Sequence, residues 1–299
     1  MNLLQNVVLV AIILMFTLAE VFSRRREPFN ATADDTRIEL FMFISLLTVT
    51  QPVIFWFTGY LSAMAMPAQR GAWAHFPWWA MAGILLVADD LTQYWWHRLS
   101  HSPRLWPLHR AHHSAHYMSI RITYRNNFFY YLMMPGLWAS GVLVYLGFAN
   151  AYLVYVTVKL AVIMGAHSAV PWDAPFYRVP WLRPIAWVLE RTISTPATHR
   201  AHHALTNEDG VGHYKGNFGN LLFIWDLMFG SAKITRLYPA KVGLQDDLMF
   251  GKERWYVEMF YPLFHSRRVQ SALVPGGRAY DGAPTEAGPV LEPVAASKV

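Results

Sequence analysis

The chain has 299 residues, of which 54% are hydrophobic and only 15% are charged. Because charged residues make up about 25% of an ordinary soluble domain, this composition indicates a membrane protein. The formal charge of +6 comes from basic residues that lie mostly between and after apolar runs, which argues against a nucleic-acid-binding stripe on a soluble face. The absence of cysteine excludes disulfides, thiolate zinc sites and iron–sulfur clusters.

Five apolar runs are long enough for membrane-spanning helices, which need about 20 residues each. They cover residues 3–22, 38–64, 76–96, 128–148 and 151–168. Pro52 either kinks the second run or divides it into two half-segments, and a turn from Gly147 to Asn150 joins the last two runs as a shallow hairpin. We therefore expect an all-α membrane protein with four or five transmembrane helices and a cytoplasmic helical cap.

The distribution of lysine and arginine predicts how these helices are oriented. Four basic residues lie in 24–37, five in 97–127, fourteen after residue 168 and none in 149–150. One basic residue lies in 65–75. If the loops alternate across the bilayer, every loop that is rich in basic residues lies on one side, as the positive-inside rule requires. Arg24, Arg25 and Arg26 follow the first run, so we expect a retained helix and not a signal peptide, with residue 1 outside and the C-terminus in the cytoplasm.

Ten of the thirteen histidines fall into two short windows, residues 97–116 and 199–213. They form three boxes: His97-Arg-Leu-Ser-His101, His109-Arg-Ala-His112-His113 and His199-Arg-Ala-His202-His203. Positions i, i+3 and i+4 share one face of a helix, so each box can direct two or three imidazoles toward one point. A lone histidine near a membrane interface is more often a hydrogen-bonding residue than a ligand. Three boxes on one predicted side nevertheless indicate a metal site in the cytoplasmic cap.

The number of box histidines indicates how many metal ions they bind. Eight exceed the four ligands of a structural zinc ion and the three of a catalytic one, so we expect two ions. Imidazole suits iron, zinc, copper and nickel alike. The zinc-protease pattern H-E-x-x-H is missing, and no box histidine has an adjacent glutamate to act as a hydrolytic base. A membrane zinc hydrolase and a non-catalytic metal or haem transporter remain as alternatives.

The helix that leads into the first box carries two further candidate residues. At about 100° per residue, Asp90, Tyr94, His97 and His101 fall within roughly 60° of one another. An ionisable residue in the cytoplasmic half of a transmembrane helix indicates function. We expect the Asp90 carboxylate to accept the second ring N–H of a ligating histidine.

Longer segments around the boxes carry a family resemblance. They are Asp90-Leu-Thr-Gln-Tyr94-Trp-Trp-His97-Arg98-Leu-Ser-His101, His109 to Ser114, Glu190 to His203, and Asn217 to Gly230. These segments resemble the three histidine boxes, and the segment after the last box, of the fatty acid hydroxylase/sterol desaturase superfamily. The resemblance covers about residues 85–230. It implies O2-dependent hydroxylation or desaturation of a lipid, such as a sterol, fatty acyl chain or ether lipid, at a centre of two iron ions.

The resemblance also implies further site residues. His167 lies where the family often has another ligand, although a helix-end histidine can also interact with the helix dipole. His116 replaces a common glutamate, and His213 precedes the family-like Asn217, so both are candidate ligands. Asp226, and with less weight Glu190, are candidate carboxylates beside the ligands, or else solvated helix charges.

Several other histidines and arginines are expected to lie outside the metal site. His75 and His265 are expected to be structural or interfacial, and Arg98, Arg110 and Arg200 to be interfacial charges.

No haem, flavin or iron–sulfur motif is visible, so electrons must come from a separate ferredoxin or cytochrome with its reductase, docked on the basic cytoplasmic face. We expect transmembrane helices in 1–84, a catalytic domain in 85–235, a cytoplasmic segment in 236–269 and a disordered tail in 270–299.

Overall fold

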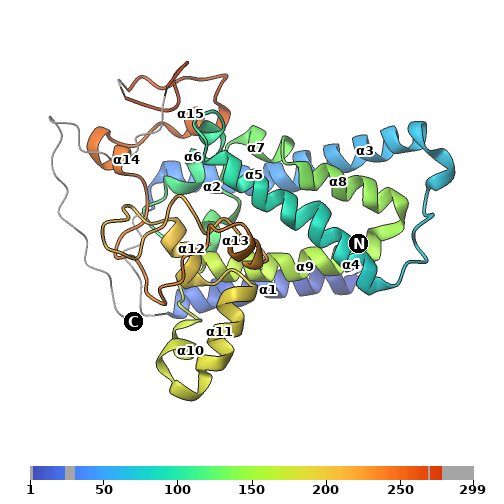
Figure 1. Ribbon diagram of the computed structural model, residues 1–299. Coiled ribbons are helices and arrows are strands. Elements are labelled where there is room, and N and C mark those ends of the chain that lie inside the picture. The colour runs from blue at the N-terminus through green and yellow to red at the C-terminus, as the bar shows by residue number, and fades with distance from the viewer. Residues whose placement is uncertain (1–2, 24–30, 269, 278–299) are drawn as a thin grey trace.

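The structure, a computed structural model, describes residues 3–23, 31–268 and 270–277. These residues form helices and loops, with no strand beyond isolated bridges such as that between Ile193 and Leu222. Figure 1 shows the long helices side by side in one elongated bundle, with shorter helices and loops gathered at one end. Parts of the predicted topology and tail depend on residues outside the described ranges. These are residue 1, Arg24 to Arg26 and residues 278–299.

The two N-terminal apolar runs form the first part of the bundle. Its elements are α1 (Leu3–Phe22), α2 (Ala33–Ser45), the π-helical segment η1 (Leu46–Thr50), α3 (Gln51–Ala65) and the short 3₁₀ helix η2 (Pro67–Gln69). The side chain of Thr32 accepts a hydrogen bond from the N–H of Asp35 (3.1 Å), and the Asp35 carboxylate accepts one from the N–H of Thr32 (2.8 Å). This reciprocal cap satisfies N–H groups that have no partner inside the helix and so fixes the start of α2.

The middle of the chain completes the bundle and carries the first two boxes. Its elements are α4 (Trp78–Leu85), the π-helical segment η3 (Leu86–Leu91), α5 (Thr92–Ser100), α6 (Trp106–His113), the 3₁₀ helix η4 (Ile120–Tyr124), α7 (Phe128–Leu132), α8 (Pro135–Leu143), the π-helical segment η5 (Val144–Phe148) and α9 (Ala149–His167). The chain reverses between α8 and α9 at Gly147, whose φ of 121° strongly favours glycine. The turn predicted around Gly147 to Asn150 is therefore confirmed at Gly147, although Ala149 and Asn150 already belong to α9.

The remaining elements are short and lie mostly at the end of the bundle where the boxes meet (Figure 1). They are α10 (Ala174–Arg178), the 3₁₀ helix η6 (Pro180–Leu182), α11 (Arg183–Thr192), α12 (Pro196–His202), α13 (Ile224–Met228), α14 (Gln245–Phe250) and α15 (Trp255–Phe260). Met259 of α15 is fully buried in a core shared with α2, α5 and α6. The disordered tail was expected to begin at residue 270, but Leu273 is fully buried.

Two helical stretches of the described chain are long and apolar enough to cross a membrane by length and composition, Ala33–Ala65 and Pro135–His167. The second stretch is not one straight helix, because the reversal at Gly147 divides it into α8 and α9. The first runs on through Pro52, which lies in the first turn of α3 directly after the π-helical segment η1. Large apolar side chains such as Trp56 and Met64 point outward from the bundle and are about two-thirds exposed, at 68% and 67%. Apolar surface of this extent indicates lipid surroundings.

Candidate metal centre

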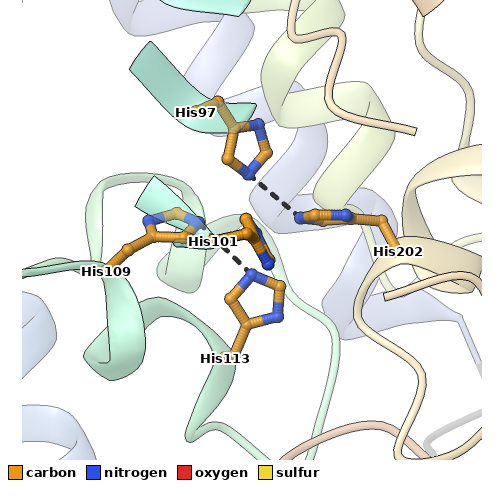
Figure 2. Close-up of side chains that lie close together, drawn as sticks. All are labelled: His97, His101, His109, His113 and His202. Carbon is orange, nitrogen blue, oxygen red and sulfur yellow. Dashed lines mark hydrogen bonds between the residues drawn. The ribbon is translucent and has the colours of Figure 1, made fainter. Parts of the chain in front are cut away.

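Nine histidines from four parts of the chain converge at one end of the bundle. These histidines form two groups, and each residue offers one ring nitrogen to its group. Within each group, the offered nitrogens lie within 4.8 Å of one another. The first group, drawn in Figure 2, is His97, His101, His109, His113 and His202. The second group is His112, His167, His199 and His203. The groups therefore offer five and four imidazole ligands.

Each H-x-x-H-H box directs two imidazoles toward one group, as expected, and its third imidazole toward the other group. In α6, His109 and His113 belong to the first group and His112 to the second. In α12, His202 belongs to the first group, whereas His199 and His203 belong to the second. Positions i+3 and i+4 lie on opposite sides of position i and are about 100° apart around the helix. One short helix can therefore present ligands to two neighbouring ions.

Hydrogen bonds at Nδ1 orient five of the rings. The acceptors are the backbone carbonyl oxygens of Phe218 for His97 (2.7 Å), Arg125 for His112 (3.0 Å), Ile163 for His167 (2.8 Å) and Gly216 for His202 (2.7 Å), and the side-chain oxygen of Asn126 for His109 (2.7 Å). A carbonyl oxygen can only accept, so each Nδ1 carries a hydrogen. In a neutral ring Nε2 then keeps a lone pair for a metal.

These lone pairs face one another at short range. Nε2 of His97 lies 3.0 Å from Nε2 of His202, and Nε2 of His112 lies 3.3 Å from Nε2 of His167. Burial lowers the pKa of His112 and of His202 well below the ordinary value, so both rings are neutral at neutral pH. Neither pair then has a proton to share. Two nitrogens bound to one metal at about 2.1 Å and at right angles would lie about 3 Å apart, so the spacing fits a metal ion.

The rest of the first group supports the same fit. Nε2 of His101 is buried and has no hydrogen-bond partner among the described residues, whereas almost all buried polar atoms in proteins have one. A metal–nitrogen bond would satisfy this atom. The donor set is made of imidazole alone, which suits a first-row transition metal.

Asp226 in α13 fixes the loop that orients His97. Its carboxylate accepts hydrogen bonds from the N–H of Phe218 (2.8 Å) and the hydroxyl of Ser231 (2.6 Å). The carbonyl oxygen of Phe218 in turn accepts the Nδ1 hydrogen of His97. The hydroxyl of Tyr94 lies 2.8 Å from that of Ser231. Asp226 and Tyr94 therefore act on the histidine through the loop and do not touch its ring nitrogens.

Asp90 holds the next part of the same loop. Its carboxylate accepts hydrogen bonds from the N–H of Leu222 (3.1 Å) and the indole N–H of Trp225 (2.8 Å). The expected hydrogen bond from a histidine ring to this carboxylate is not formed. The reason is that a backbone carbonyl, that of Phe218, already accepts the second N–H of His97.

The family profile described as fatty acid hydroxylase matches residues 81–231, a range that holds all nine grouped histidines. This chain belongs to the fatty acid hydroxylase family. Its relatives include the alkylglycerol monooxygenase of Xenopus tropicalis, 26% identical over 165 residues, which are 52% of this chain and 30% of the relative. The alkylglycerol monooxygenase of Danio rerio is 27% identical over 213 residues, which are 64% of this chain and 38% of the relative. The chain thus spans about a third of the length of these relatives. No solved structure matches it.

Two candidate ligands of this fatty acid hydroxylase family member lie outside both groups. Nε2 of His213 is 3.1 Å from the backbone carbonyl oxygen of Ser231. Nε2 of His116 is buried and has no hydrogen-bond partner within the described chain. His75 and His265, which were expected to lie outside the site, are exposed.

Charged residues near the boxes have other roles than those predicted. Arg110 in α6 is fully buried and contacts Asp247 of α14 (2.5 Å) and Glu258 of α15, so it is not an interfacial charge. Glu190 forms an ion pair with Arg236 (2.7 Å). This contact does not support the expected role of Glu190 as a carboxylate beside a metal ligand. All three partners come from the chain after residue 235, and local sequence does not indicate that this part of the chain returns to the boxes.

The sequence prediction also missed the loop that orients the second box. Asn126 and the backbone of Arg125 accept the ring N–H groups of His109 and His112. The side chain of Arg125 donates to the carbonyl oxygen of Ala111 (2.6 Å) and lies 3.5 Å from the carboxylate of Glu258. The polar triplet at 125–127, just before an apolar run, is the feature of the sequence that could have indicated this loop.

A cavity of about 90 Å³ adjoins both groups. Its lining includes His97 and His109 of the first group and His112 and His167 of the second. The remaining lining residues come mainly from the long helices of the bundle and the loops beside them, among them Met134 on the loop before α8. The histidines therefore face a space between helices that a substrate could enter.

Proposed function

We propose that this protein is an integral-membrane di-iron oxygenase that hydroxylates a lipid. The observation that carries the proposal is the convergence of nine histidines into two groups with inward-facing Nε2 atoms, in a chain of the fatty acid hydroxylase family. Iron held by these two groups would supply the activation of O2 and the oxidation of an unactivated C–H bond. One oxygen atom enters the product and the other leaves as water, and the balance requires two protons and two electrons from a separate donor.

The residues of the chain itself orient the ligands and exclude water. The backbone carbonyls of Phe218 and Arg125 fix the rings of His97 and His112 before any substrate binds. The cavity beside them lies between packed helices, and the apolar and aromatic part of its lining would place a lipid close to the ligands. Positioning of this kind lowers the entropic part of the barrier.

An apolar groove of about 720 Å³ between α1, α2 and α9 supports a lipid substrate. Tyr124 and Leu160 line both this groove and the cavity at the histidines. A lipid from the bilayer would enter the groove from the side, and movement of the Tyr124 side chain would open the way to the ligands. Sterols, fatty acyl chains and ether lipids are the candidate classes, and the names of the relatives favour testing ether lipids first.

The proposed topology follows from the apolar runs and the loop charges. α1, α2 with α3, α4 with α5, α8 and α9 supply the four or five spans, with the catalytic region in 85–235. The histidine groups and the C-terminus face the cytoplasm, where a ferredoxin or cytochrome with its reductase delivers electrons. No nucleic-acid partner is proposed.

The alternatives explain fewer of these features. A zinc hydrolase needs a general base near the metal, and both groups consist of histidine alone. A transporter would place its sites near the middle of the membrane, whereas the grouped histidines lie at one end of the bundle. Desaturation would use the same site, and we propose hydroxylation because it is the commoner reaction implied by the family resemblance.

Lipid extracts of cells test the proposal. Cells that express the protein should contain a lipid that has gained one oxygen atom and is absent from cells with His112→Ala or His202→Ala, which remove one ligand from each group. His75→Ala, a change at an exposed histidine, should leave the new lipid in place. Identical lipid profiles for the protein and its ligand variants would refute the proposed function.

A further inference from the structure

A buried ion pair lies inside the bundle, away from the histidine end. Lys159 of α9 donates a hydrogen bond to Asp89 of η3, and the hydroxyl of Tyr155 donates to the same carboxylate oxygen (2.8 Å). Lys159 and Asp89 precede His167 and His97 on their helical runs by the same eight positions, or about 12 Å of helix. Ionisable groups at membrane depth are costly and indicate function. Asp89 also lies in a π-helical segment, a distortion that is frequent at functional sites.

The ion pair lines the same cavity as the histidines. Asp89, Lys159, Gln51 and Gln93 all contribute to its wall. The side-chain oxygen of Gln93 is buried and has no hydrogen-bond partner among the described residues. Lys159 has three N–H donors and one hydrogen-bond acceptor within the described chain, Asp89. The cavity is therefore polar at the end that lies deeper in the bundle.

These polar groups need a partner inside the cavity. Almost all buried polar atoms in proteins form a hydrogen bond. A pure hydrocarbon chain would leave the side-chain oxygen of Gln93 without one and would offer Lys159 no acceptor beyond Asp89 among the described residues. The partner must donate a hydrogen bond to the Gln93 oxygen and accept one from the Lys159 ammonium. A hydroxyl group can do both at once.

The local charge disfavours an anionic partner. Asp89 is buried, at 4% exposure, and already pairs with Lys159. A carboxylate or phosphate in this cavity would be buried beside a cation that is already neutralised, which is costly. A neutral hydroxyl avoids this cost.

We propose that the polar end of the cavity is a binding subsite for the hydroxyl group of a lipid alcohol and that Gln93 selects for it. The inference rests on the proposed function and adds the substrate class, a neutral hydroxyl-bearing lipid in place of a plain hydrocarbon or a free fatty acid. Gln93 lies one helical turn before His97, which is about 6 Å along the helix axis. The carbon that is oxidised therefore lies close to the hydroxyl group.

Binding measured without turnover tests this subsite separately from the oxygenase reaction. Hexadecanol, hexadecane and hexadecanoic acid would be titrated under anaerobic conditions into the purified, metal-loaded protein in detergent, with the thermal unfolding midpoint as the readout. We expect hexadecanol to bind most tightly. Gln93→Leu should weaken hexadecanol binding by about tenfold, the loss expected for one hydrogen bond, and leave hexadecane binding unchanged.

Two variants and the metal content control the experiment. Gln69→Leu, a change at an exposed glutamine in η2, should keep the preference for hexadecanol. If Gln93→Leu does not fold, Gln51→Leu tests the same wall and should also lower the preference. Equal binding of hexadecanol and hexadecane by the unmodified protein, tighter binding of the acid, or a preference that survives in Gln93→Leu would overturn the proposal. A preference for the alcohol in a protein that makes no O2-dependent product would instead leave the subsite standing and refute only the oxygenase function.

Discussion

Nδ1 of His112 lies 3.0 Å from the backbone carbonyl oxygen of Arg125. The guanidinium of the same arginine contacts Asp35 of α2 (2.9 Å) and Glu258 of α15 (3.5 Å). Glu258 also contacts Arg110 within the second box. A buried carboxylate near the C-terminus, outside the range matched by the family profile, is thus connected to the residues that orient the ligands.

Glu258→Gln should lower metal affinity by about 10–100-fold, the range for loss of a residue that supports a ligand. The change removes the negative charge that Arg110 and Arg125 share, and the loop that accepts the ring N–H of His112 loses its support. A competition titration with a chelator measures this. Glu253→Gln is the matched control, because Glu253 is also buried in this segment but accepts hydrogen bonds from Ser266 and Ser271 and contacts Arg268 (3.5 Å), not Arg110 or Arg125. Equal metal loss in both variants would indicate general destabilisation and not ligand orientation.

Asn126→Ala should weaken metal binding by a similar factor, because the side-chain oxygen of Asn126 accepts the Nδ1 hydrogen of His109 and the ring is then free to rotate. Asn126→Asp keeps an acceptor at this position and should restore most of the affinity. The same chelator titration compares the two. An aspartate variant as weak as the alanine variant would show that the hydrogen bond to His109 is not what matters at this position.

Metal analysis of single variants tests the division into two groups. The unmodified protein should hold two ions, and His113→Ala and His203→Ala, one from each group, should each hold about one. His116→Ala and His213→Ala should still hold two, because both residues lie outside the groups. Complete metal loss in both His113→Ala and His203→Ala, or a loss in His213→Ala alone, would contradict this assignment.

Gly141→Ala should destabilise the packing of α3 against α8 by about 1–3 kcal/mol, the usual cost of overpacking. A Cβ atom at Gly141 would overlap the buried side chain of Thr58 on α3. Gly83→Ala is the control, since a Cβ there would meet nothing within 4 Å. The thermal unfolding midpoint in detergent should fall for the first variant only.

The sequence predicted the elements of this molecule better than the contacts between them. Apolar runs and box spacing depend on local periodicity, so the helices, the turn at Gly147 and the family could all be inferred. The split of His109 and His112 between the two histidine groups depends on how α6 meets α5, α9 and α12, which no local pattern contains. Asp90 was a candidate because of its helix face, but its partners Leu222 and Trp225 lie more than a hundred residues away.

The source of the oxygen atom tests the central claim most directly. Membranes that contain the protein would be incubated with a reduced electron donor under isotopically heavy O2, and the lipids analysed by mass spectrometry. We predict that one heavy oxygen atom enters a lipid product, that the label is lost with His112→Ala or His202→Ala, and that heavy water contributes none. Lipid turnover that continues unchanged without O2, or a product oxygen that comes from water, would contradict the assignment of this protein as an oxygenase.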